Sequence, residues 1–280
     1  MRKPANTFVL LMIVFLLSNL ASAQKIKAED VIAKHLDSIG TAQAREAAKT
    51  LLIVGNGTSK FTSTKDITLQ GKIVLASEGV NNFLGMNMNS PLYSGEKFAY
   101  NGKDVFVGFA TVSVRSVLGN FVQSNTGIVS EGLVGGTLST SWALERLASN
   151  KAKVSSNGIK KIDGKELYAI SYSKKGGSDL DITLYFDKDT FRHVRTEYKR
   201  VASVGIGVGL SDSARANEIR YSFVEEFGDF KAEAGLSLPH TYRMVYSATG
   251  TQGTTGIEWN FVLSDFTRNQ KLESSTFSAV

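Results

Sequence analysis

Few residues of this chain have the types and spacing that chemistry requires. Its three histidines, His35, His193 and His240, lie far apart in the sequence and lack the spacing of metal ligands. The chain has no cysteine, which excludes thiol nucleophiles and cysteine-ligated metals. It also has no Gly-x-Ser-x-Gly elbow, no His-Glu-x-x-His motif and no Ser-x-x-Lys motif followed by a partner motif. We therefore expect no enzyme, no metal and no cofactor, and a hydrolase with an unrecognised site is the least favoured reading.

Two further patterns imitate known sites without completing them. Glycine alternates with aliphatic residues from Val204 to Leu210, but a dinucleotide fingerprint needs a strand before it and a helix after it. A hairpin tip is the better interpretation. Asp187-Lys188-Asp189 begins like a calcium loop but lacks the following glycine and the distant glutamate, so we expect a turn.

The elements that position these residues are mostly strands. An amphipathic helix opens the folded part, with His35 on its apolar stripe and Gly40 as its stop, and a short helix from Thr41 to Lys49 follows. We expect His35 to be a hydrogen-bonded core residue. The sequence predicts ten to twelve short strands with hairpin spacing, in residues 51–109 and again from Val154 onward. Nothing resembles a repeated strand–helix–strand unit. The sheet should be antiparallel, with Asn56-Gly57, Asn101-Gly102 and Asp163-Gly164 as tight turns.

Residues 111–150 interrupt the strands with a segment of little charge and much apolar surface. A helical face is expected from Val114 to Val122, then a flexible glycine-rich stretch at 132–136, then a helix capped by Ser139 or Thr140. Such a segment needs a surface to pack on, and the open face of the sheet is the candidate.

The first 23 residues have the layout of a cleavable export signal. Arg2 and Lys3 form a basic head, an apolar run follows, and Ala21-Ser22-Ala23 supplies the small residues before the cleavage site. We expect cleavage after Ala23 and a periplasmic protein in one domain over 24–280, with an uncleaved anchor as the alternative. Without a cysteine after the signal, the chain cannot be lipid-anchored as bacterial lipoproteins are.

The net charge is +6, or +4 once Arg2 and Lys3 leave with the signal, and the remaining basic residues are dispersed in pairs such as Lys160-Lys161. Solvated strand faces explain such pairs, and a transient contact with a membrane surface is the functional alternative. We expect no nucleic-acid partner and a monomer.

The order of these elements resembles a known superfamily. The residues that carry the resemblance are the helix ending in Ile39-Gly40, the mid-chain insert, and three late stretches of the chain, 184–190, 227–230 and 235–239. The chain resembles the outer-membrane lipoprotein-sorting (LolA/LolB-like) superfamily, in its divergent bacterial branch. The resemblance implies a mainly β (α+β) fold, a curved antiparallel half-barrel whose concave apolar face is covered by helices. It implies a carrier that holds a lipid, an acyl chain or a lipidated protein under a helical lid.

Two departures limit what the resemblance carries over. No residue matches the carrier's functional arginine well, although Arg115 lies at the start of the lid segment, and the receptor's acylation cysteine is absent. The expected cavity lining is a set of apolar residues from the strands and the insert: Phe83, Met86, Met88, Phe106, Phe109, Leu118, Phe121, Val122, Leu133 and Trp142. Ordinary core is the alternative for each, and a structural or interaction protein of the cell envelope without cargo is the alternative function.

Overall fold

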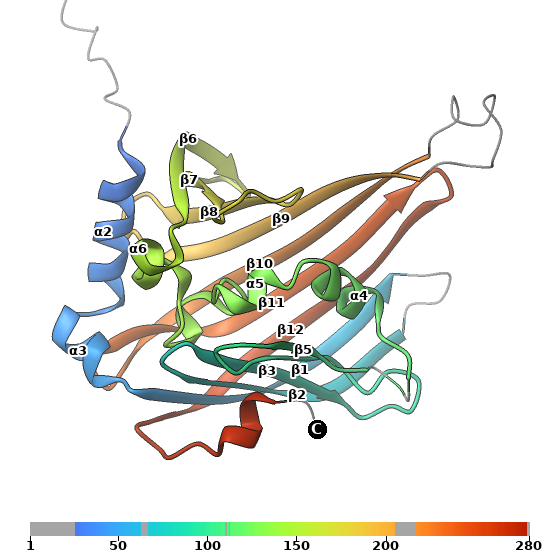
Figure 1. Cartoon of the computed structure of the whole chain (residues 1–280), viewed down its shortest axis with the longest axis horizontal. Coiled ribbons are helices and arrows are strands. Elements are labelled where there is room, and N and C mark those ends of the chain that lie inside the picture. Colours follow the sequence, from blue (N-terminus) through green and yellow to red (C-terminus); the bar gives the residue numbers. More distant parts are fainter. Residues whose placement is uncertain (1–25, 63–66, 110, 112, 205–216, 279–280) are drawn as a thin grey trace, which may run out of the picture.

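The computed structural model describes residues 26–62, 67–109, 111, 113–204 and 217–278. Twelve antiparallel strands form a single open sheet, which curves around a set of short helices (Figure 1). The fold class expected from the sequence is therefore confirmed. The strands are β1 (Thr50–Thr62), β2 (Ile67–Glu78), β3 (Asn81–Met88), β4 (Lys97–Tyr100), β5 (Val105–Val107), β6 (Lys153–Ile162), β7 (Lys165–Ser173), β8 (Asp181–Asp187), β9 (His193–Val204), β10 (Asn217–Glu233), β11 (Leu236–Gly250) and β12 (Gly253–Arg268).

Two meanders make up this sheet. Strands β1 to β5 follow one another along one half, and β6 to β12 follow one another along the other. The halves join where β1 pairs with β12, from Leu51 opposite Arg268 to Thr62 opposite Gly256. The short β5 and the bulged β6 are the two edges.

Helix α2 (Ala28–Ile39) stands at one end of the sheet, and α3 (Ala42–Ala47) turns the chain into β1 (Figure 1). Val31, Ile32 and His35 point into the core, as their spacing predicts. Gly40 ends α2 with φ of 155°, and the guanidinium of Arg45 donates to the carbonyls of Leu36 and Gly40 (2.7 and 2.5 Å). These bonds satisfy carbonyls that the end of a helix leaves free.

The insert between β5 and β6 lies across the inner face of the sheet (Figure 1). It contains α4 (Val117–Ser124), α5 (Gly127–Ser130), the 3₁₀ turns η1 (Gly136–Leu138) and η2 (Ala143–Arg146), and α6 (Leu147–Asn150). One buried apolar cluster contains residues of α2, of the insert and of both halves of the sheet, so the insert completes the core. Another 3₁₀ turn, η4 (Ser274–Phe277), contacts β3 and β4.

Several local expectations are confirmed. Asn101-Gly102 and Asp163-Gly164 lie in the tight connections between β4 and β5 and between β6 and β7. The carboxylate of Asp187 accepts hydrogen bonds from the amides of Asp189 and Thr190, which makes this segment a turn. The Gly-rich stretch 204–210 and the export signal lie almost wholly outside the described residues.

Other local expectations are wrong. Asn56-Gly57 is no turn but the middle of β1, where a Cβ on Gly57 would come within 2.0 Å of the Asn260 carbonyl oxygen. Val114 precedes α4 and is exposed. Ser139 and Thr140 cap no helix, because η2 begins after Trp142 without a side-chain cap.

The glycine-rich stretch at 132–136 is not an open loop either. Gly136 is buried with φ of +51°, and Gly132 has φ of +74° against the Ser141 carbonyl. Close packing and backbone conformation explain the glycines here.

Candidate functional site

An apolar groove opens at the end of the sheet away from α2. It lies between the ends of β1, β2 and β12 on one side and the segment leading into α4 on the other, and its volume is about 500 Å³. This volume is in the range of small-molecule sites. The lining is mostly aliphatic and aromatic, and its apolar members are Phe61, Ile67, Leu69, Leu92, Tyr93, Val114, Val117 and Ile257.

The rim of this groove exposes large apolar side chains to solvent. Leu92 is 80% exposed, Val114 59%, Val117 47% and Ile67 43%. These four are among only nine large apolar side chains exposed anywhere in the described part of the chain. Their gathering at one groove is significant because scattered exposed apolar residues need no explanation, whereas a cluster indicates a binding surface.

Two further cavities adjoin the groove. One of about 580 Å³ lies along β5 and shares Arg115 with the groove, and one of about 400 Å³ lies behind α4 and shares Val117. The charged residues that line the three are Lys97, Arg115 and Arg200. No carboxylate is among the described residues that line them.

A buried polar network adjoins the groove, whose lining includes its members Tyr93 and Ser116. The hydroxyl of Tyr93 donates to Oε1 of Glu96 (2.7 Å) and accepts from the indole of Trp259 (3.0 Å). Ser116, the N-cap of α4, hydrogen-bonds the same carboxyl and also accepts from the Gly119 amide (2.7 Å). Burial raises the pKa of Glu96 to about 7, although these two hydrogen bonds oppose the rise. The network ties the first turn of α4 to β4 and β12.

Some of the ten residues proposed from the sequence lie near these cavities. Phe106 and Phe109 line the cavity along β5, and the Arg115 guanidinium stacks on the Phe109 ring at 4.8 Å. Phe121 lines the cavity behind α4 and contacts the rings of Tyr221, Phe223 and Tyr246. Phe83 is half-buried beneath the ammonium of Lys97.

The structure does not bring the ten together at one cavity. Six of them are buried in the core cluster and line none of the three cavities: Met86, Met88, Leu118, Val122, Leu133 and Trp142. The groove itself is lined by residues outside that set.

Polar anchors hold the insert against the sheet. The hydroxyl of Tyr172 donates to Glu131 (2.6 Å), and the Thr140 amide donates to Ser77 (2.9 Å). Glu225, on β10, is the most connected anchor. Its carboxyl accepts from the Gly135 amide (2.8 Å) and from the hydroxyls of Tyr198 and Tyr242 (2.7 and 2.5 Å), and burial raises its pKa to about 7. These anchors fix the insert on the sheet, and the cavity of about 400 Å³ lies between α4 and strands β9 to β11.

Two of the histidines, which lie far apart in the sequence, meet in the core. The rings of His35 and His193 are 6.0 Å apart, and Trp142 stacks on His193 at 4.9 Å. Nδ1 of His35 bonds the Phe191 carbonyl (3.0 Å) and its Nε2 accepts from the Trp142 indole (3.1 Å), so the expected hydrogen-bonded core role is confirmed. Burial lowers the pKa of His35 to about 3, and that of His193 also falls. Both rings are therefore neutral and pack as core.

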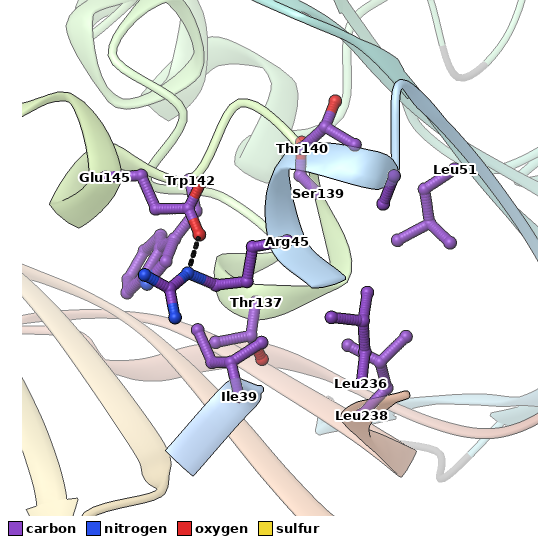
Figure 2. A pocket seen from close by; sticks show the side chains of 11 residues that line it. Ile39, Arg45, Leu51, Thr137, Ser139, Thr140, Trp142, Glu145, Leu236 and Leu238 are labelled. Carbon is purple, nitrogen blue, oxygen red and sulfur yellow. Dashed lines mark ion pairs between the residues drawn. The ribbon is translucent and has the colours of Figure 1, made fainter. Parts of the chain in front are cut away.

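A small cavity of about 60 Å³ lies between α3, η1 and β11 (Figure 2). Arg45 reaches Glu145 across it (3.0 Å), and the buried hydroxyls of Thr137 and Thr140 have no hydrogen-bond partner among the residues that the structure describes. Such a volume suits a few water molecules, which would satisfy these hydroxyls, and is too small for an acyl chain. The larger groove is therefore the candidate site.

Sequence reasoning missed the residues that make this groove. Leu92, in the turn after Pro91, was visible as an apolar residue at a place where turns are polar. Tyr93 and Glu96 gave no signal, because only the folded chain brings them under Ser116 and Trp259.

Comparisons with known proteins find similar solved structures at low sequence identity. No known family and no curated protein matches the chain by sequence. A LolA superfamily protein from Nitrosomonas europaea is similar in structure, with 14% identity, coverage of 91% of this chain and 98% of that one, and a TM-score of 0.46. A DUF1329 family protein from Desulfovibrio piger has 13% identity and a TM-score of 0.41, and the match covers 89% of this chain and 96% of that one.

A domain from Vibrio parahaemolyticus, named for outer-membrane lipoprotein sorting, has 13% identity and a TM-score of 0.40. The match covers 88% of this chain and 97% of that one. The first and the third carry the superfamily name that the sequence resemblance gave. At these identities the likeness concerns the fold alone.

Two classes of feature are missing from the part of the chain that the structure describes. No group of three His, Cys, Asp or Glu side chains is placed to hold a metal ion. In the same residues, none of the helices combines the length and apolar character needed to cross a bilayer.

Proposed function

We propose that the chain is a non-enzymatic periplasmic carrier that binds an acyl chain, of a lipid or of a lipidated protein, in the apolar groove. The observation that supports this most is the groove's own chemistry: about 500 Å³, an apolar lining and a rim of exposed aliphatic side chains. Transfer of an acyl chain from water into such a site gains about 0.8 kcal/mol per CH₂ group, so no specific polar contact is needed for binding.

This proposal moves the site from the place that the sequence suggested. Phe121 and Trp142 are 5% and 1% exposed and belong to the buried core cluster, and Phe121 also lines the cavity behind α4. The groove lies instead at the margin of the insert, where the segment before α4 meets the ends of β1 and β12.

The anchoring of the insert on the sheet favours a second candidate function. An envelope protein with a sealed core and no cargo would also have an insert held by Glu225, Glu131 and Ser77. In that case the apolar rim would be a contact surface for another protein rather than the mouth of a ligand site.

Variants of the groove separate the two. Val114→Asp places a charge in the lining, and Val262→Asp is its matched control, since Val262 is 62% exposed on β12 and lines none of the three cavities. Binding of the neutral apolar dye 1-N-phenylnaphthylamine is followed by fluorescence. We expect Val114→Asp to weaken binding at least about fivefold, because burial of a valine contributes about 1.5 kcal/mol.

Val262→Asp should bind as the unaltered chain does. Native mass spectrometry of the chain purified from a bacterial periplasm should show a bound lipid that is lost on unfolding. A chain that stays empty after incubation with mixed lipids, and equal dye binding by both variants, would refute the carrier and favour the contact surface.

A further inference from the structure

The charges around the groove are of one sign. Lys97 and Arg115 line the cavity along β5, Arg115 also lines the groove, and the described lining contains no carboxylate. A cavity with cations and no acid attracts anions, and its low-dielectric walls strengthen that attraction.

Arg115 has unused hydrogen-bonding capacity. Its Nε is 3.4 Å from the Val107 carbonyl oxygen, at the long limit of a hydrogen bond, and its guanidinium lies on the Phe109 ring. Within the described residues no carboxylate pairs with it. By contrast, Arg195 and Arg243 each pair with two glutamates.

Lys97 complements Arg115 from β4. Its ammonium is 5.9 Å from the Phe83 ring and, within the described residues, it also has no carboxylate partner. The nearby carboxyl of Glu96 is buried and already accepts from Tyr93 and Ser116. Two cations therefore face one cavity of about 580 Å³ with their charges uncompensated.

We propose that Arg115 and Lys97 bind the anionic headgroup of a single-chain amphiphile, a fatty acid or an alkyl phosphate, whose chain lies in the apolar groove. The inference rests on the proposed function and adds the class of ligand. Arg115 is common to both cavities, so it stands where the headgroup of a ligand ends and the chain begins.

The chemistry of arginine fits this position. A guanidinium offers a planar fork of donors that matches a carboxylate or a phosphate, and its stacking on Phe109 holds the fork in place before the ligand arrives. Lys97 adds a second charge without a fixed geometry, which suits headgroups of different shape.

The test compares two ligands of equal length, dodecanoate and the uncharged dodecanamide, as competitors of 1-N-phenylnaphthylamine. The double variant Arg115→Gln/Lys97→Gln removes the proposed headgroup site. The double variant Arg192→Gln/Lys34→Gln is the matched control: it loses the same charge, and both cations also stand over aromatic rings, those of Phe230 and Phe191, outside the three cavities.

We expect the unaltered chain to prefer dodecanoate over dodecanamide by about tenfold, as one charge-assisted hydrogen bond allows. The Arg115→Gln/Lys97→Gln variant should lose that preference and bind dodecanamide unchanged, while the control variant keeps the preference. Inorganic phosphate alone should not compete with the dye.

Three results would overturn the headgroup site. The first is dodecanamide binding as tightly as dodecanoate to the unaltered chain, which refutes the headgroup site but leaves the groove as the binding site of the acyl chain. The second is an equal loss of preference in the control variant, which assigns the effect to net charge. The third is binding of inorganic phosphate, seen by calorimetry and lost with Arg115, without a gain from the acyl chain. If neither amphiphile binds the unaltered chain, the groove itself fails and this inference fails with it.

Discussion

Glu96 is a buried carboxyl, close to the groove, through which pH should act on the stability of this fold. Its carboxyl is 5% exposed, and burial raises its pKa from 4.5 to about 7 in the folded chain. Because the folded pKa is above the unfolded one, its favourable contribution is complete below pH 4.5 and is lost as pH rises through 7. The difference corresponds to about 3 kcal/mol of stability between the protonated and the ionised state.

Glu96→Gln removes this titration and keeps the shape of the side chain. The amide oxygen of the glutamine still accepts the hydrogen bond from the Tyr93 hydroxyl. We therefore expect the free energy of unfolding of Glu96→Gln, relative to the unaltered chain, to rise by about 3 kcal/mol from below pH 4.5 to above pH 8. Urea unfolding followed by fluorescence at several pH values measures it. His35 and Glu225 titrate in both proteins, so their contributions cancel in the difference.

Glu218→Gln is the control, since Glu218 is exposed and its carboxylate pairs with Arg220 on the same strand. Its stability difference from the unaltered chain should stay nearly flat over the same range. A flat difference for Glu96→Gln as well, or one that falls as pH rises, would refute the reasoning, because the carboxyl would then be solvated or held ionised by its hydrogen bonds.

The core around Trp142 gives two further predictions. Trp142→Phe removes the donor to His35 and leaves a buried ring nitrogen unsatisfied, so we expect a loss of about 1–3 kcal/mol in urea unfolding, and an unchanged midpoint would contradict the bond. Gly136→Ala places a Cβ at φ of +51° and 2.9 Å from His193, which should cost about 1–3 kcal/mol. Gly176→Ala, at φ of +87° with open space around it, should cost less, and equal losses would show that the contact with His193 is unimportant.

The repeating features of the fold were predictable from the sequence because they depend on neighbouring residues. The stripe containing Val31 and His35 identified α2, and alternation identified the late strands. Asn56-Gly57 misled because a turn dipeptide carries only a local preference. Inside β1 the close approach of the Asn260 backbone makes a glycine necessary at position 57, and only the tertiary structure reveals this.

The candidate site was less predictable for a physical reason. In a sequence, an apolar residue such as Met86 or Trp142 looks the same whether it fills a core or lines a cavity. The structure places both in the core. What makes the groove is exposure of Leu92 and Val114, and exposure depends on how far the insert extends over the sheet. No local pattern encodes that extent.

The pairing of β1 with β12 has a consequence for how the chain acquires its structure. Leu51 meets Arg268 only after more than two hundred intervening residues have been made, so the central ladder of the sheet closes last during synthesis. Contacts of such sequence separation slow folding, because the loop entropy is lost before the contacts are gained. Until β12 has been made, the β1 edge of the first meander stays unpaired, and an unpaired edge is a template for aggregation.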